Sequence, residues 1–317
     1  MKKPKVTVLG SFVVDLMSKT PHLPARGETV FGGPFKLGPG GKGSNQGIAA
    51  HKLGADVTMI TKVGRDDFAQ IALNSFKSIG MRTDYIFFDN KHETGAALIM
   101  VENGTGENEI VVSIGACNYI TDDEVESARE EIRNSKLLLT QLETNLSAVY
   151  KAIDIANEYG VMVVLNTAPI QSIPEQIYKK VNVLTPNEIE ASILSGIKIK
   201  DIEGAKKAAE YFVEKGVKSV VITLGSNGAY VKSPEFEGHV PAFALDNVID
   251  TTGAGDAFNG GLATALAEGK SIKEAVIFGN AVAGISITRI GTAPAMPWRE
   301  EVEEFLKKHF TEVIKNE

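Results

Sequence analysis

From about residue 120 onward, short apolar runs alternate with longer amphipathic segments. The runs, rich in valine, isoleucine and leucine, cover 137–142, 161–166, 181–186 and 219–225. The segments with helical periodicity cover 122–133, 145–160, 187–195 and 201–215. Strands buried on both faces have this continuous apolar character, and parallel strands need crossover connections, which are usually helices. The alternation therefore predicts an α/β fold, with a doubly wound, mostly parallel sheet covered by helices on both faces.

The first third of the chain contains strand-like segments that do not follow this alternation. After a first strand at 5–10, they lie at 28–36, 94–102 and 109–114. The last two are joined by the turn 103–108, which begins with Asn-Gly, a strong hairpin signal. Strands of this kind are either a cover over a site or a hairpin at a sheet edge with no role in function.

We predict a small antiparallel β-sheet, inserted as a lid and drawn from roughly 12–38 and 92–116. A length of 317 residues fits one large domain or two of average size. With an inserted lid, the prediction is a single domain over 1–317.

Charge and cysteine content limit the partners and the compartment. The chain has 33 Lys and Arg against 40 Asp and Glu, a net charge of −7, and no basic block, so nucleic acid is not expected as a partner. The single cysteine, Cys117, predicts a reducing compartment, the cytoplasm. No signal sequence or membrane-spanning run is recognisable, so no membrane partner is expected. An acidic chain that binds a polyphosphate must attract it by local geometry.

The segment 250–258 (DTTGAGDAF) concentrates the features of an anion site. It follows a strand-like stretch and opens a helix of small residues. At Gly253, Ala254 and Gly255, backbone amides of a helix N-terminus can point outward and attract negative charge. Asp256 adds a carboxylate that can remove a hydroxyl proton, as phosphoryl transfer to an alcohol requires. The alternative is that Asp256 only caps the helix.

A second glycine-rich segment, 38–43 (GPGGKG), formally satisfies G-x-G-x-x-G. It does not follow the first strand directly and no acidic residue appears near 58–62, so a dinucleotide site is excluded. The phosphate loop G-x-x-x-x-G-K-[ST] also fails, because Gly43 follows Lys42. What remains is a tight turn into a helix that carries Lys42 and Asn45, two groups suited to binding hydroxyls. A solvated helix start is an equally acceptable interpretation.

Together, 40–46 (GGKGSNQ) and 250–261 (DTTGAGDAFNGG) resemble the two signatures of the ribokinase-like (PfkB) carbohydrate kinases. The resemblance covers essentially the whole chain, including 141–143 (QLE), 185–190 (TPNEIE), 222–228 (ITLGSNG) and 288–302. Within the family, the chain is most similar to the ribokinases.

The resemblance implies a doubly wound kinase with a β lid that often forms a homodimer contact. It implies transfer of the ATP γ-phosphate to the terminal (5-) hydroxyl of a pentose, with ribose expected, helped by Mg²⁺ and a monovalent cation, K⁺. By the same resemblance, Asp256 is the catalytic base and the amides of Gly253, Ala254 and Gly255 form the anion hole.

The remaining functional positions are also assigned by resemblance. The sugar-contacting positions are Asp15, Val13, Gly41, Lys42, Asn45 and Glu143. The nucleotide-binding positions are Asn187, Thr223, Gly225, Gly228 and Asn280. The metal positions are Glu190, which holds Mg²⁺ through water, and Asp250, Thr252 and Gly291, which surround the monovalent cation. From the sequence alone, Asn187 and Glu190 also fit a helix capping box.

Two residues depart from the ribokinase pattern. Val13 stands where ribokinases carry a sugar-contacting Asn, and deoxyribokinase-like members have a similar apolar replacement. A polar site rejects an analogue lacking a hydroxyl by about 10⁴–10⁵, whereas an apolar pocket rejects an added hydroxyl by only about 10². We therefore expect both ribose and 2-deoxyribose to be accepted. Ala295 stands where ribokinases often have a cation-ligating Ser, so we expect activation by K⁺ to be weaker or to use a water molecule in place of that Ser.

Other functions stay open at this point. The chain can be a 2-deoxyribose kinase or another PfkB sugar or nucleoside kinase. A different class is a catalytically silent regulator that binds sugar or nucleotide on the same fold. Asp256 beside an intact glycine run favours the enzyme, because a silent module has no reason to keep both.

Overall fold

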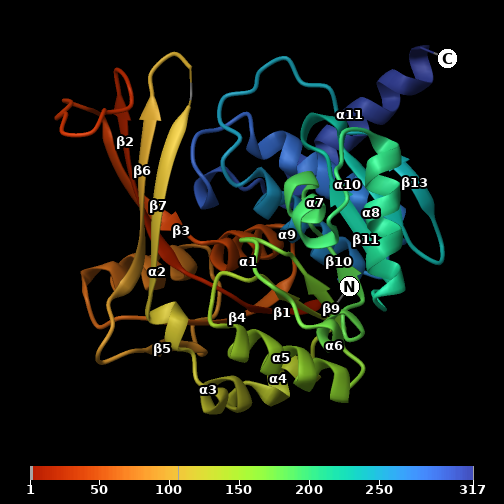
Figure 1. Ribbon diagram of the computed structural model, residues 1–317, viewed down its shortest axis with the longest axis horizontal. Coiled ribbons are helices and arrows are strands. Elements are labelled where there is room, and N and C mark those ends of the chain that lie inside the picture. The colour runs from red at the N-terminus through yellow and green to blue at the C-terminus, as the bar shows by residue number, and fades with distance from the viewer. Residues whose placement is uncertain (1–2, 106, 317) are drawn as a thin grey trace.

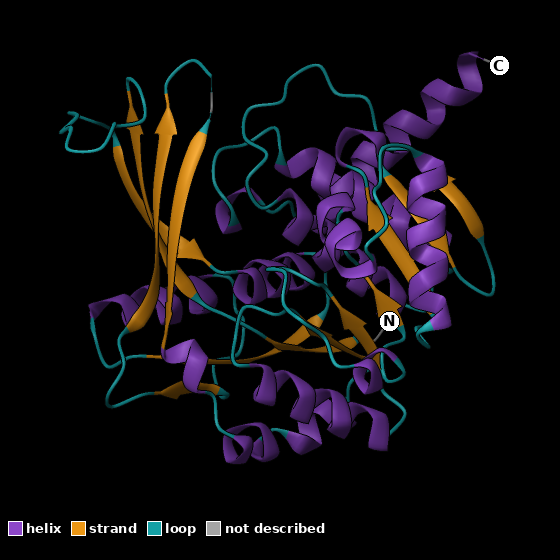
Figure 2. Ribbon diagram, viewed as in Figure 1, coloured by secondary structure: helices purple, strands orange, loops and turns teal. Residues whose placement is uncertain are grey.

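The computed structural model describes residues 3–105 and 107–316, which form two β-sheets and their surrounding helices (Figures 1 and 2). The strands are β1 (Lys5–Leu9), β2 (Val13–Thr20), β3 (Phe35–Gly40), β4 (Asp56–Val63), β5 (Ile86–Phe88), β6 (Thr94–Glu102), β7 (Asn108–Gly115), β8 (Leu137–Thr140), β9 (Met162–Leu165), β10 (Val183–Leu184), β11 (Ser219–Thr223), β12 (Ala229–Lys232) and β13 (Glu237–Val240).

The α-helices are α1 (Lys42–Lys52), α2 (Asp67–Ser78), α3 (Asp122–Ser127), α4 (Arg129–Arg133), α5 (Leu146–Glu158), α6 (Glu175–Tyr178), α7 (Glu188–Ser195), α8 (Ile202–Glu214), α9 (Ala254–Ala267), α10 (Ile272–Ser286) and α11 (Arg299–Asn316). Short 3₁₀ helices are η1 (Ala116–Tyr119), η2 (Gly225–Asn227) and η3 (Ala293–Ala295). In the parts of the chain just described, no helix combines the length and the apolar character that crossing a membrane requires.

The larger sheet confirms the predicted α/β fold. Its nine strands have the order β13-β12-β11-β10-β9-β8-β1-β4-β5. Neighbouring strands are parallel from β11 to β5, and β12 and β13 extend one edge as antiparallel strands. The predicted helical segments are present, except that 122–133 is divided at Ala128 into α3 and α4.

Alternate side chains of the central strands enter two separate hydrophobic cores. Along β8, Leu137 and Leu139 belong to the core that includes residues of α1, α2, α9 and α10. Leu138 belongs to the core that includes residues of α3, α5 and α8. Because both faces of these strands are buried, their sequences are apolar throughout, and this is the pattern from which the sheet was predicted.

The smaller sheet is the predicted lid, with the strand order β3-β2-β6-β7 (Figure 1). Its outer pairs are antiparallel, so β6 and β7 pair as expected, and the turn predicted between them includes residue 106, which lies outside the described residues. The central pair, β2 and β6, is parallel, because both strands leave the larger body in the same direction.

The predicted strand at 28–36 is wrong over most of its length, because β3 begins only at Phe35. Gly33 has a φ of 152° and Pro34 lacks an amide hydrogen, so this part of the chain cannot continue a strand ladder. Residues 28–34 instead belong to the loop that precedes β3.

Candidate active site

The candidate site lies where the parallel strands of the larger sheet end. Ser11 follows β1, Glu143 follows β8, Asn166 follows β9 and Asn187 follows β10, each within a few residues of the last strand position. In open α/β sheets, ligands bind in the crevice at the carboxyl ends of the strands. The sheet order therefore brings together residues that are far apart in the sequence.

The N-terminus of α9 faces this crevice. Gly253 is its N-cap, with a left-handed φ of 77° that favours glycine, and no side chain caps the helix. A Cβ built on Gly255 would meet no atom within 4 Å, so open space adjoins the first turn. The first amides of α9 are thus accessible to an anion. One expectation about this segment is wrong: no strand directly precedes it, because β13 ends at Val240 and a long loop leads to Gly253.

Asp256 lies in the first turn of α9 and is held by two side chains of α1. Its side chain is buried, with 8 % exposed. Asn45 Nδ2 donates to Asp256 Oδ2 at 3.0 Å, and Gln46 Nε2 donates to Asp256 Oδ1 at 2.9 Å. Because both oxygens are directed at α1, the capping interpretation of Asp256 does not hold. Asn45 Oδ1 is buried with no partner in the described protein, which leaves it free to accept a ligand's hydroxyl.

Lys42 and three carboxylates determine the charge of the crevice. Burial raises the pKa of Asp256, while the Lys42 ammonium and the Gln46 and Asn45 amides act in the opposite direction. Burial acts to lower the pKa of Lys42, but Asp256, Glu143 and Glu190 outweigh it and raise that pKa. Lys42 therefore stays positively charged. Its charge interacts both with Glu143, which is assigned to the sugar, and with Glu190, which is assigned to Mg²⁺.

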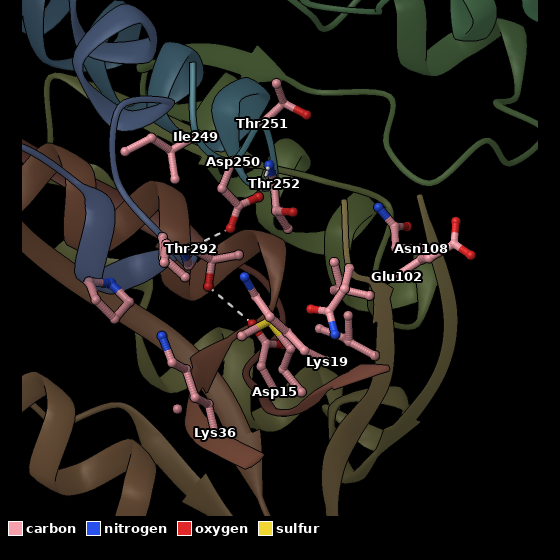
Figure 3. A pocket seen from close by; sticks show the side chains of 18 of the residues that line it. Asp15, Lys19, Lys36, Glu102, Asn108, Ile249, Asp250, Thr251, Thr252 and Thr292 are labelled. Carbon is pink, nitrogen blue, oxygen red and sulfur yellow. Dashed lines mark hydrogen bonds between the residues drawn. The ribbon is translucent and has the colours of Figure 1, made fainter. Parts of the chain in front are cut away.

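Asp15 projects from β2 of the lid into a pocket of about 660 Å³ between the lid and two loops of the body (Figure 3). Thr292 Oγ1 donates to Asp15 Oδ2 at 3.0 Å. A Cβ on Gly40 would lie 2.0 Å from Asp15 Oδ1, so only glycine fits beside this carboxylate. Asp256 does not line the pocket; it lies deeper, near enough to affect the pKa of Asp15.

The pKa of Asp15 is raised to about 6. Burial is the largest cause, the hydrogen bond from Thr292 opposes it, and the charges of Glu143 and Asp256 add to it. A carboxyl group in this range changes from donor to acceptor between pH 5 and 7.

The other predicted sugar-side residues surround the start of α1. Glu143 Oε2 accepts hydrogen bonds from Ser11 Oγ at 2.5 Å and from the Lys42 amide at 2.8 Å. Gly41 has a φ of 89°, and a Cβ there would lie 2.9 Å from the backbone nitrogen of Val13. Val13 is buried and brings no polar atom to this corner beyond its backbone.

The predicted phosphate-side residues form the capping box expected from the sequence. Asn187 caps α7, and Glu190 Oε2 accepts from the Asn187 amide at 3.0 Å and from Thr167 Oγ1 at 3.1 Å. Thr223 pairs with Asn187 as an isolated parallel bridge, so the end of β11 adjoins this motif.

The remaining nucleotide positions meet at the segment 240–242. A Cβ on Gly228 would lie 2.2 Å from the Val240 carbonyl oxygen, and Asn280 Nδ2 donates to the Pro241 carbonyl at 3.0 Å. Gly225 begins the turn η2 at a φ of 57°. None of these residues lines the pocket that Asp15 enters.

Asp250 anchors the loop assigned to the monovalent cation. Its Oδ1 accepts from the Thr252 amide and its Oδ2 from the Gly291 amide, both at 2.9 Å. An anchored carboxylate beside backbone carbonyls is a donor set that suits a hard cation. Within residues 3–105 and 107–316, no group of three His, Cys, Asp or Glu side chains could hold a metal ion. A Mg²⁺ ion near Glu190 would therefore depend on phosphate oxygens and water as well.

Sequence reasoning missed a buried amide network behind Asp256. Gln141 Nε2 donates to Gln46 Oε1 at 2.7 Å, and Gln46 Nε2 also donates to Asn166 Oδ1 at 3.1 Å. Asn166 Nδ2 donates in turn to the Thr185 carbonyl at 2.7 Å. Because Gln46 Oε1 accepts from Gln141, the Nε2 donor of Gln46 is the group that faces Asp256. Gln46 lies inside the motif 40–46 and Gln141 inside 141–143. The signal that could have indicated Gln141 was a polar residue at the end of the apolar run 137–142. Thr292 was missed as well.

Comparison with known proteins decides the family. A model of the pfkB family carbohydrate kinases matches residues 3–299. The chain belongs to this family. As a pfkB-family carbohydrate kinase, it is a phosphotransferase that acts on a sugar hydroxyl.

Its relatives include both pentose kinase types. The kinase is 41 % identical over 302 residues to the ribokinase of Haemophilus influenzae, covering 95 % of this chain and 98 % of that protein. It is 36 % identical to the deoxyribokinase of Salmonella typhi, covering 95 % and 98 %. The structure of Arabidopsis thaliana ribokinase complexed with ribose and ATP matches with a TM-score of 0.88 at 30 % identity, covering 96 % and 99 %.

Proposed function

We propose that this kinase transfers the γ-phosphate of ATP to the 5-hydroxyl of ribose. The observation that carries the proposal is the position of Asp256: it lies at the open N-terminus of α9 and is held by Asn45 and Gln46. Similarity to ribokinases over nearly the full chain, including one complexed with ribose and ATP, supports the substrate pair.

In this proposal, each group has a distinct task. The carboxylate of Asp256 takes the proton of the 5-hydroxyl as its oxygen bonds to the γ-phosphorus and the bond to ADP breaks. The amides of Gly253, Ala254 and Gly255 bind the negative oxygens of the transferred group, as oriented donors do in an anion hole. Asp15, Gly41, Lys42, Asn45 and Glu143 would bind the sugar.

Nucleotide and metal ions would occupy the other side of the crevice. We propose that Thr223, Gly225, Gly228 and Asn280 contact the nucleotide and that Asn187 and Glu190 hold water around Mg²⁺. When bound, Mg²⁺ would neutralise charge on the phosphates. Asp250 and the carbonyls of Thr252 and Gly291 would hold K⁺, and Ala295 would supply no side-chain oxygen to that ion.

We also propose a homodimer through the outer face of the lid. Leu37, Leu16, Leu98 and Val111 are cross-strand neighbours on the face opposite Asp15. Leu98 is 58 % exposed and Val111 63 % exposed, so the face is apolar and uncovered in a single chain.

The experiment that tests the function is an ADP-release screen over pentoses, hexoses and nucleosides, with and without K⁺. Turnover highest on ribose supports the proposal. Sugar or nucleotide binding without ADP release would instead favour a silent regulator, and a preference for a hexose or nucleoside would overturn the pentose assignment.

A second candidate substrate is 2-deoxyribose, and Val13 is the observation that favours it. Because Val13 presents no polar side-chain atom, we expect the ratio of kcat/KM for ribose over 2-deoxyribose to stay below about 10³. Val13→Asn should raise that ratio, and Val13→Ala, which adds no polar atom, is the matched control. A native ratio above about 10³ would contradict the prediction.

Sugar binding should weaken as the pH falls through about 6, the pKa of Asp15. The ionised carboxylate accepts sugar hydroxyls and is present above that pH, so affinity should drop about tenfold between pH 7 and pH 5. Calorimetric titration of ribose measures this directly. Because Asp256 also has a raised pKa, the titration is repeated with Asp256→Asn, and the same pH dependence should remain. An affinity independent of pH in both proteins would remove Asp15 from the sugar site.

A further inference from the structure

Thr292 stands where three parts of the molecule meet. Its hydroxyl lies 3.0 Å from Asp15 Oδ2 on β2 and 3.2 Å from the Pro39 carbonyl oxygen on β3. On its other side, a Cβ on Gly253 would lie 3.3 Å from the Thr292 methyl group. The preceding residue, Gly291, binds Asp250 through its amide. One buried side chain, 8 % exposed, thus contacts two of the four lid strands, β2 and β3, and the N-cap of α9.

The contact with Asp15 has a consequence for what that carboxylate can bind. A carboxylate has two oxygens, and Thr292 donates to Oδ2. Both oxygens lie close to Gly40, where a Cβ would collide with them, and Oδ1 carries no hydrogen bond from the described protein. Figure 3 shows Asp15 and Thr292 joined at the pocket wall. Oδ1 therefore keeps its full acceptor capacity for a ligand, whereas Oδ2 shares its capacity with Thr292, so Asp15 presents its stronger acceptor to one hydroxyl.

We propose that Thr292 is a positioning residue that restricts Asp15 to one sugar hydroxyl and so determines how the kinase discriminates ribose from 2-deoxyribose. This inference rests on the proposed function. Val13 lies on the same pocket-facing side of β2, two residues before Asp15, and brings no second polar group. Thr292 and Val13 together reduce the number of side-chain acceptors that β2 offers to the sugar.

The hydroxyl of Thr292 opposes the effect that the nearby carboxylates have on the pKa of Asp15. Glu143 and Asp256 face it from the body, and Lys19, Lys36 and Asp250 line the same pocket. Burial and the two nearer carboxylates raise the pKa of Asp15, and the Thr292 hydrogen bond counters this rise. The same bond thus favours the ionised form of Asp15 and orients its carboxylate.

The test compares Thr292→Val, which keeps the shape and removes the hydroxyl, with Thr292→Ser, which keeps the hydroxyl. In Thr292→Val, Asp15 Oδ2 becomes free for a second hydroxyl, so kcat/KM for ribose over 2-deoxyribose should rise about tenfold. The fall of sugar affinity at low pH should also move to higher pH, because Asp15 loses a donor. Thr292→Ser should match the native protein in both measurements.

A role in packing alone predicts a different outcome, because valine fills the same space. An unchanged sugar ratio together with an unchanged pH profile in Thr292→Val would overturn the proposal. If Thr292→Val does not fold, Thr292→Ala is used with the same two readouts. If the native protein phosphorylates no sugar, the proposed function fails. The ratio of ribose to 2-deoxyribose dissociation constants, measured by calorimetry, then decides the role of Thr292 independently.

Discussion

Asp256→Asn is expected to lower kcat by about 10²–10⁴ while ribose binding stays within a few-fold of the native value. The substitution keeps the shape of the side chain and removes the carboxylate that we propose as the proton acceptor. Asn45 and Gln46 both donate to Asp256, so one of them will face the new amide's hydrogens and lose its partner. This local loss is small beside the loss of the base, because the amide network behind Gln46 keeps its own hydrogen bonds.

Steady-state kinetics give kcat, and calorimetry gives the ribose dissociation constant. Asp122→Asn is the matched control, since Asp122 is an exposed acid in the first turn of α3. It should leave both quantities unchanged. Near-normal turnover in Asp256→Asn would remove Asp256 from the role of base.

Gly43→Ala is expected to destabilise the folded protein. A Cβ at Gly43 would lie 2.5 Å from the Cα and carbonyl carbon of Gly10 and 2.6 Å from the Ser11 nitrogen. These are backbone atoms that cannot rotate away, so α1 must shift from the end of β1. Overpacking of this kind costs about 1–3 kcal/mol and occasionally more.

The helix cannot shift freely, because its other side is equally close to α9. A Cβ at Gly260 would lie 2.5 Å from the Ala49 Cβ. We expect thermal unfolding of Gly43→Ala several degrees below the native midpoint, together with lower activity, since α1 carries Lys42 and Asn45. Gly38→Ala is the control, because a Cβ there meets nothing within 4 Å. Equal unfolding midpoints for the two variants would show that α1 can shift without a loss of stability.

Local patterns carried most of the fold. The apolar runs of the central strands were recognisable because each strand is buried on both faces, and the hairpin of the lid because its turn begins with Asn-Gly. Where prediction failed, the local signal was ambiguous: 28–36 has strand-forming residues, but Gly33 and Pro34 stop the ladder before β3.

The candidate site was predictable only where its residues share a motif. Asp256 and the glycines before it are contiguous, and so are Lys42 and Asn45. The bond between Thr292 and Asp15 joins positions 277 residues apart and depends on how β2 and the loop before α11 meet. No pattern in the sequence encodes that contact. The orientation of the Gln46 amide likewise follows from Gln141 and Asn166, which only the sheet order brings together.

The charges around Lys42 affect the release of the phosphorylated product. Asp256, Glu143 and Glu190 all act on this ammonium, and Asp15 is close enough to Asp256 and Glu143 to feel their charge. A neutral sugar enters such an acid-lined crevice without penalty, but a phosphorylated sugar carries new negative charge. In the proposed mechanism, Asp256 gives up the proton that it takes from the hydroxyl, and its carboxylate and the new phosphate then repel each other. In that mechanism, the residues that prepare the hydroxyl for attack also favour departure of the product.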